Sequence, residues 1–179
     1  MVIKILVGIA VIAVGAVAVI AMQPSEFRVV RTATMRAPVS AVFAQINDFH
    51  HWQAWSPWAR RDPAMKQTYE GAAAGEGAIY SWAGNREVGT GRMTLVESRP
   101  DERIRINLEF FEPFAATNTA EFTFRPEGNG TIVTWSMTGR NNFVGKAIGL
   151  VMNMDTMIGG DFEKGLAAMQ SVAEASARR

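Results

Sequence analysis

The chain has 179 residues, a formal net charge of +1, two histidines and no cysteine. The balanced charge gives no basic footprint for nucleic acid, and the lack of cysteine excludes disulfides, thiolate nucleophiles and cysteine-based metal sites. Ten methionines, ten phenylalanines and five tryptophans suit either an adaptable apolar pocket or a packed core.

An uninterrupted apolar run from Ile5 to Met22 opens the chain. As a helix it would span roughly 27 Å, close to a hydrocarbon core of about 30 Å. We therefore predict that residues 1–22 form a transmembrane signal anchor. The alternative is a signal peptide cleaved after residues 16–18 or 19–21, although such peptides usually have a shorter apolar region of about 7–15 residues. Basic residues flank both ends, so the sequence leaves open which side of the membrane the rest of the chain occupies.

Residues 23–179 have the size of one domain. Pro24-Ser25 ends the apolar helix, and alternating apolar residues then predict a strand from residue 27 to 35. Apolar residues at helical spacing predict an amphipathic helix over 38–48 and a second short helix over 49–56.

The middle of the chain predicts a meander of strands. Ile104, Ile106, Leu108 and Phe110 alternate with polar residues, which is typical of an antiparallel sheet with one apolar face. The predicted strands cover residues 65–69, 78–82, 88–96, 103–110, 118–125 and 131–138.

The last part of the chain, residues 143–179, predicts helix. Gly159-Gly160 is expected to interrupt it, with Asp161 capping a restart. A long C-terminal helix laid across a curved antiparallel sheet would cover the apolar face of the sheet, giving an α+β fold.

Several segments carry a family resemblance. Residues 49–58 (FHHWQAWSPW) resemble the W-x-x-W-S-P-W segment of bacterial proteins in the polyketide cyclase/dehydrase group of the START/Bet v 1-like superfamily, also called SRPBCC. Residues 80–82, 88–94, 133–137 and 157–166 resemble the same group, although Gly160 stands where the family usually has proline.

This resemblance implies a helix-grip fold for residues 23–179: a curved antiparallel sheet wrapped around a long C-terminal helix. Many members also carry one N-terminal membrane helix, so the resemblance places the chain in a bacterial inner membrane as a single-pass protein. The superfamily hosts carriers, cyclases and sensors, so the resemblance is specific for fold rather than for activity.

The resemblance further implies a cavity between the concave sheet face and the C-terminal helix. Each of the apolar side chains assigned to it would serve equally well in a packed core. They are Tyr80, Trp82, Met93, Phe110, Phe122, Trp135 and Met137 from the sheet, Met152, Met157, Phe162, Leu166 and Met169 from the helix, and Trp55 and Trp58 at the mouth.

The sequence contains few residues that suggest a catalytic site. Adjacent positions point about 100° apart on a helix, so His50 and His51 are not expected to chelate a metal together. Arg92 and Glu97 lie near the presumed cavity, but alternation does not turn them inward. We expect no metal and no cofactor, and no catalytic residue is identified.

Three functions remain open. The first is membrane-tethered binding of a hydrophobic small molecule or lipid, the expected partner, in an internal apolar cavity. The second is a structural or interaction module of the cell envelope whose cavity is filled by its own side chains. The third is a polyketide cyclase or dehydratase, motivated by the family alone. We rank them in this order. The sequence leaves open whether the protein is an enzyme, and favours a non-enzymatic role; an enzyme would be a cyclase or dehydratase of polyketide-like substrates.

Overall fold

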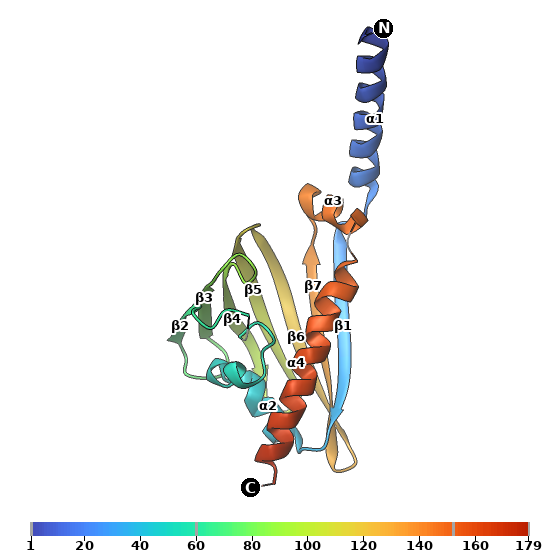
Figure 1. Ribbon diagram of the computed structural model, residues 1–179. Coiled ribbons are helices and arrows are strands. Elements are labelled where there is room, and N and C mark those ends of the chain that lie inside the picture. The colour runs from blue at the N-terminus through green and yellow to red at the C-terminus, as the bar shows by residue number, and fades with distance from the viewer. Residues whose placement is uncertain (1, 60, 152, 179) are drawn as a thin grey trace.

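The computed structural model describes residues 2–59, 61–151 and 153–178. Figure 1 shows a curved sheet with one long helix across it and a second helix projecting from one end. In chain order the elements are α1 (Val2–Met22), β1 (Glu26–Met35), α2 (Val39–Asn47), η1 (Phe49–Ala54), β2 (Lys66–Gly71), β3 (Ala78–Ala83), β4 (Thr90–Arg99), β5 (Arg103–Glu112), β6 (Ala116–Glu127), β7 (Gly130–Arg140), α3 (Phe143–Val151) and α4 (Met154–Ser176).

The seven strands form one antiparallel sheet in the order β1-β7-β6-β5-β4-β3-β2. The predicted strands are all present, and with the long helix α4 they confirm the α+β helix-grip fold. The sequence did not reveal a bulge in β4 after Leu95, which shifts the register with β5 before Glu97. A bulge adds a residue without a partner, so regular alternation cannot continue through it.

Strand pairing aligns the inward-facing side chains in rows across the sheet. One row places Trp135, Phe122 and Ile104 side by side, with Trp135 stacked on Phe162 of α4, and all three are buried. We call the end of the sheet where β7 leads into α3 the α3 end. A second inward-facing row, closer to this end, contains Phe27, Gly139, Asn118, Leu108, Met93 and Tyr80.

The short helix η1 folds back beneath α2 and is held there by two tryptophans. The indole of Trp52 donates to the carbonyl of Ile46 at 3.0 Å, and that of Trp55 donates to the carbonyl of Gln45 at 3.0 Å. These carbonyls belong to the last turn of α2, which has no partners of its own within the helix. The tryptophan-rich segment is therefore an architectural feature that closes one end of the interior.

The C-terminal helical region is divided at a different place from the one predicted. α3 ends at Val151, Asn153 caps α4 by accepting from the amide of Thr156 at 3.1 Å, and α4 runs unbroken through Gly159-Gly160. The predicted restart at Asp161 is wrong, because that carboxylate lies inside α4 and accepts from Arg61 at 2.5 Å.

The helix α1 stands apart from the rest of the chain. It spans 21 residues with a mean hydropathy of 2.9, and none of its residues is buried. It is the one helix within the described ranges that is long and apolar enough to cross a membrane. The C-terminal end of α1, which we call its foot, contacts α3, since the Lys146 ammonium donates to the carbonyl of Ala21 at 3.0 Å.

Candidate functional site

The interior between the sheet and α4 is the candidate site. Its deeper half, which lies away from the α3 end, is filled by aromatic rings. The indole of Trp135 stacks on Phe162 of α4 with ring centroids 3.9 Å apart and planes 6° apart. Phe122 stacks on the same indole at 4.8 Å, and Trp55 meets it edge-on at 5.7 Å. Such aromatic pairs contribute about 0.5–1.5 kcal/mol each beyond their burial. This half is therefore packed as a core.

The predicted site residues are not equally enclosed. Met157 lies in the first turns of α4 with 45% of its surface exposed, and Met152 lies outside the described residues. Trp58, Trp82 and Phe110 are partly buried. The buried members are Trp55, Tyr80, Met93, Phe122, Trp135, Met137, Phe162, Leu166 and Met169.

At the α3 end the concave face is less well covered. Leu108 and Phe110 continue the inward alternation of β5 beyond the buried Ile104 and Ile106, yet both stay partly exposed. Trp82 on β3 is also partly exposed and meets Phe110 edge-on at 5.8 Å. Helix α4 packs chiefly on β1, at the far side of the sheet, so these side chains lie beyond its cover.

Two buried polar atoms facing this interior have no hydrogen-bond partner among the described residues. One is the side-chain carbonyl oxygen of Asn118, and the other is the indole nitrogen of Trp135. Asn118 faces inward between Leu108 and Gly139, and its side chain lies over the space that Gly139 leaves free. An unpaired buried polar group costs about 1–3 kcal/mol, so this oxygen lies in the interior without the hydrogen bond that would compensate its burial.

Tyr80 is the inward-facing titratable group of the same row. Burial raises the pKa of its hydroxyl to about 12, with a further contribution from neighbouring Tyr69. The hydroxyl is therefore protonated throughout the physiological range, which suits hydrogen bonding and not general-base catalysis.

The two charged residues considered for catalysis lie on the outer face. Arg92 is exposed and bonds to Ser81. Glu97 accepts from Arg103 at 2.6 Å and also pairs with Arg99 and Arg105. The hydrogen bond from Arg103 lowers the pKa of Glu97, so this carboxylate stays ionised and is a poor proton donor.

The two histidines bond to different groups. The ring of His50 lies 2.7 Å from a carboxylate oxygen of Asp48 and stacks on Tyr69, whereas that of His51 lies 2.9 Å from the carbonyl of Ala44. No group of three potential metal ligands occurs among the residues the structure describes.

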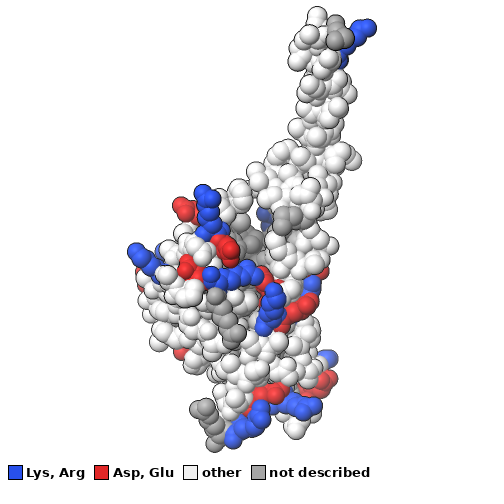
Figure 2. Space-filling view, viewed as in Figure 1, with Lys and Arg blue, Asp and Glu red and all other residues white. Residues whose placement is uncertain are grey.

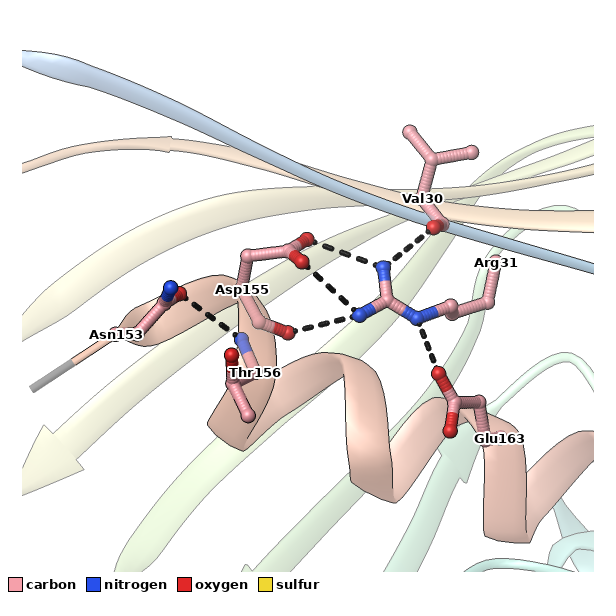
Figure 3. A network of polar contacts seen from close by, with 6 residues as sticks. All are labelled: Val30, Arg31, Asn153, Asp155, Thr156 and Glu163. Atoms are coloured by element: carbon pink, nitrogen blue, oxygen red, sulfur yellow. Dashed lines mark hydrogen bonds and ion pairs between the residues drawn. The ribbon is translucent and has the colours of Figure 1, made fainter.

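An arginine on the inner face of β1 holds the start of α4 in place (Figure 3). The guanidinium of Arg31 contacts both carboxylate oxygens of Asp155, at 3.0 and 3.1 Å, and Glu163 at 2.6 Å. It lies directly over Gly159, where any side chain would displace it. The hydrogen bonds from Arg31 lower the pKa of Asp155, so the pair is ionised at neutral pH.

Two hollows lie outside this interior. One, of about 360 Å³, is polar and lies on the outer sheet face between Arg28, Arg105 and Glu121. The other, of about 440 Å³, lies at the foot of α1, where Pro24, Phe27 and Leu150 contribute to its lining.

Comparisons with solved structures agree with the fold. A protein of unknown function from Staphylococcus aureus matches with a TM-score of 0.65 and 14% identity over 89% of this chain and 99% of that one. A protein from Nitrosospira multiformis matches with a TM-score of 0.60 and 19% identity over 86% and 100%. The di-domain ARO/CYC StfQ of the steffimycin biosynthetic pathway matches with a TM-score of 0.62 and 12% identity over 87% of this chain and 53% of StfQ. At these identities the likeness establishes the fold alone.

A comparison with curated proteins finds no match. A family model does match, over residues 26–174, and its description is polyketide cyclase / dehydrase and lipid transport. The match covers every strand together with α2, α3 and nearly all of α4, and leaves out α1. The chain therefore belongs to the polyketide cyclase/dehydrase and lipid transport family.

Proposed function

We propose that this protein is a single-pass membrane protein whose domain, residues 23–179, binds a hydrophobic small molecule or lipid at the α3 end of its concave face. Residues 1–22 act as the membrane anchor in this proposal. The main support for this proposal is the partial exposure of Trp82, Leu108 and Phe110, which face inward but are not covered by α4. Apolar walls with a few placed polar groups are typical of small-molecule sites.

The polar group in this arrangement is Asn118. Its side-chain carbonyl oxygen is buried, lies beside Leu108 in the register and receives no hydrogen bond from the described residues. A ligand that carries a hydroxyl or amide donor on an otherwise apolar body would satisfy this oxygen. The domain is thus expected to prefer an amphipathic lipophile over a pure hydrocarbon.

Photolabelling of the full chain in lipid nanodiscs tests this proposal. The probes are a photoactivatable phospholipid and a photoactivatable hydroxyanthraquinone, and the labelled peptides are identified by mass spectrometry. We expect labels in β4–β6 as well as in α1. Leu108→Trp should fill the partly uncovered space at the α3 end of the concave face. It should reduce β4–β6 labelling about tenfold, which corresponds to about 1.4 kcal/mol. Its matched control, Asn107→Trp, places the same bulk on the outer face and should leave labelling unchanged.

Labelling of α1 alone with both probes would overturn the binding proposal and favour a structural module with a filled interior. Conversion of a linear polyketide precursor by the unlabelled chain, lost in Leu108→Trp and retained in Asn107→Trp, would instead assign a cyclase or dehydratase activity to the same site.

A further inference from the structure

Helix α3 exposes an apolar face to its surroundings. Phe143, Val144, Leu150 and Val151 are 50, 46, 45 and 82% exposed. Positions seven apart lie almost above one another on a helix, so 143 and 150, and 144 and 151, form one continuous stripe. A stripe of this kind, on a nine-residue helix with a single charged residue, is unusual for a surface that faces water.

The contact between α3 and α1 determines how far α3 lies from the membrane. Lys146, the charged residue of α3, donates to the carbonyl of Ala21 at 3.0 Å, and α1 ends at Met22. The 21 residues of α1 span about 31 Å as a helix, which matches a hydrocarbon core of about 30 Å. When α1 spans the bilayer, Ala21 therefore lies at the edge of the hydrocarbon and α3 lies beside it, at the level of the headgroups.

The contact between Lys146 and the foot of α1 is also electrostatically favourable. The last turn of α1 contains no basic residue, and its carbonyls form the negative end of the helix dipole. The Lys146 ammonium supplies the positive charge from α3, while its aliphatic stem can lie along apolar surface as lysines do at membrane boundaries.

Two further exposed aromatic side chains lie at this end of the molecule. Phe111, near the end of β5, and Phe114, in the β5–β6 connection, are 51 and 59% exposed. In Figure 2 the charged side chains gather on the body of the domain, whereas α1 is nearly free of them. Exposed aromatic side chains beside the end of an apolar helix suit the interface between water and lipid.

We infer that α3 is an interfacial helix, with its stripe of Phe143, Val144, Leu150 and Val151 inserted among the lipid headgroups and its Lys146 bonded to the foot of α1. The occupant of this surface is the bilayer itself. The inference rests on the membrane anchor of the proposed function, but not on ligand binding. It holds the α3 end of the concave face against the membrane surface, where a lipophile would enter directly from the lipid.

The cysteine-free chain allows a direct depth measurement. Single cysteines at Val144, Ile12 and Asn129 are labelled with the fluorophore NBD, and the full chain is placed in phosphatidylcholine vesicles. Ile12 reports on α1, and Asn129, in the exposed β6–β7 turn, reports on the end of the domain opposite α3. Quenching is compared between aqueous iodide, lipids spin-labelled near the headgroup and lipids spin-labelled near the tail end.

We expect the Val144 label to be quenched most by the shallow lipid, as for a side chain about 5–10 Å into the interface. The Ile12 label should be quenched most by the deep lipid, and the Asn129 label by iodide alone. A Val144 label that behaves like Asn129 while Ile12 remains deep would overturn the inference and leave the anchor intact. An Ile12 label open to iodide would overturn the anchor and the inference together. A Val144 label shielded from all three quenchers, with disulfide cross-linking between unlabelled Val144→Cys chains, would assign the surface to a second copy and overturn the inference.

Discussion

Two glycines of α4 allow the packing of the interior to be tested by adding one methyl group at each. In a helix, alanine is more favourable than glycine by about 1 kcal/mol. A methyl group at Gly160 would meet nothing within 4 Å, so Gly160→Ala should gain about this amount. At Gly165 the methyl group would lie 2.9 Å from the indole of Trp135 and 3.2 Å from the ring of Pro57.

The indole has little room to withdraw, because Phe162 and Phe122 stack on it at 3.9 and 4.8 Å. Overpacking of such a core costs about 1–3 kcal/mol, which cancels or exceeds the helix gain. Gly165→Ala should therefore be less stable than Gly160→Ala by about 1–3 kcal/mol, at least about 2 °C in melting temperature for a chain of this size.

Thermal unfolding of both variants, in the same detergent and followed by near-ultraviolet circular dichroism, gives this difference. Gly160→Ala serves as the matched control because it changes the same helix in the same way without touching the aromatic rings. If Gly165→Ala were as stabilising as Gly160→Ala, the space beside Trp135 would be empty, and the view that the deeper half of the interior is filled would be refuted.

Two further predictions concern the start of α4. The pKa of Asp155 is lowered in the folded chain, so its pair with Arg31 stabilises the fold above the ordinary carboxyl pKa and loses this contribution as pH falls through the lowered value. Thermal melts between pH 7 and 3 should therefore show a smaller loss on acidification for Asp155→Asn than for the unmodified chain; equal losses would contradict the pairing. Asn153→Ala removes the cap on Thr156 and should cost about 1 kcal/mol in the same melts at pH 7, while Asn153→Asp, which can still accept, should retain most of it. A variant Asn153→Ala as stable as the unmodified chain would show that the cap is unimportant.

The strands could be predicted because alternation is a local property. Ile104 and Ile106 are both entirely buried and flanked by polar residues, so two neighbouring pairs already identify the inner face. The strand ends were less accurate. β4 begins at Thr90 and not at residue 88, because Gly89 adopts a positive φ of 68° and forms part of the turn. Side-chain pattern does not report such a backbone conformation.

The helix boundary was misplaced because a glycine has two possible roles. In the sequence Gly159 favours a break, but in the structure it leaves space for the guanidinium of Arg31, which comes from a strand more than a hundred positions earlier. Long-range packing of this kind has no local signature. A usable signal did exist at Asn153, since an asparagine followed two positions later by Asp155 is a typical helix start.

The candidate site could be predicted only as a set of side chains on one face. Alternation places Trp135 and Phe110 equally on the concave side, yet Trp135 is stacked between other rings and Phe110 stays partly exposed. The difference comes from where α4 crosses the sheet, which depends on contacts with β1 such as those of Arg31. The unpaired oxygen of Asn118 likewise depends on the side chains that surround it, and the sequence does not specify them.

The position of β1 has a consequence for how the chain is made. β1 is the first strand to be synthesised, yet its hydrogen-bonding partner is β7, the last, and Thr32 pairs with Thr134, 102 positions later. At about 5–20 residues per second, β1 waits roughly 5–20 s for this partner. During that time both of its edges are open to other chains, a known route to aggregation. The first strand therefore needs protection from other chains during synthesis, and a ribosome that stalls before β7 leaves a sheet that cannot be completed.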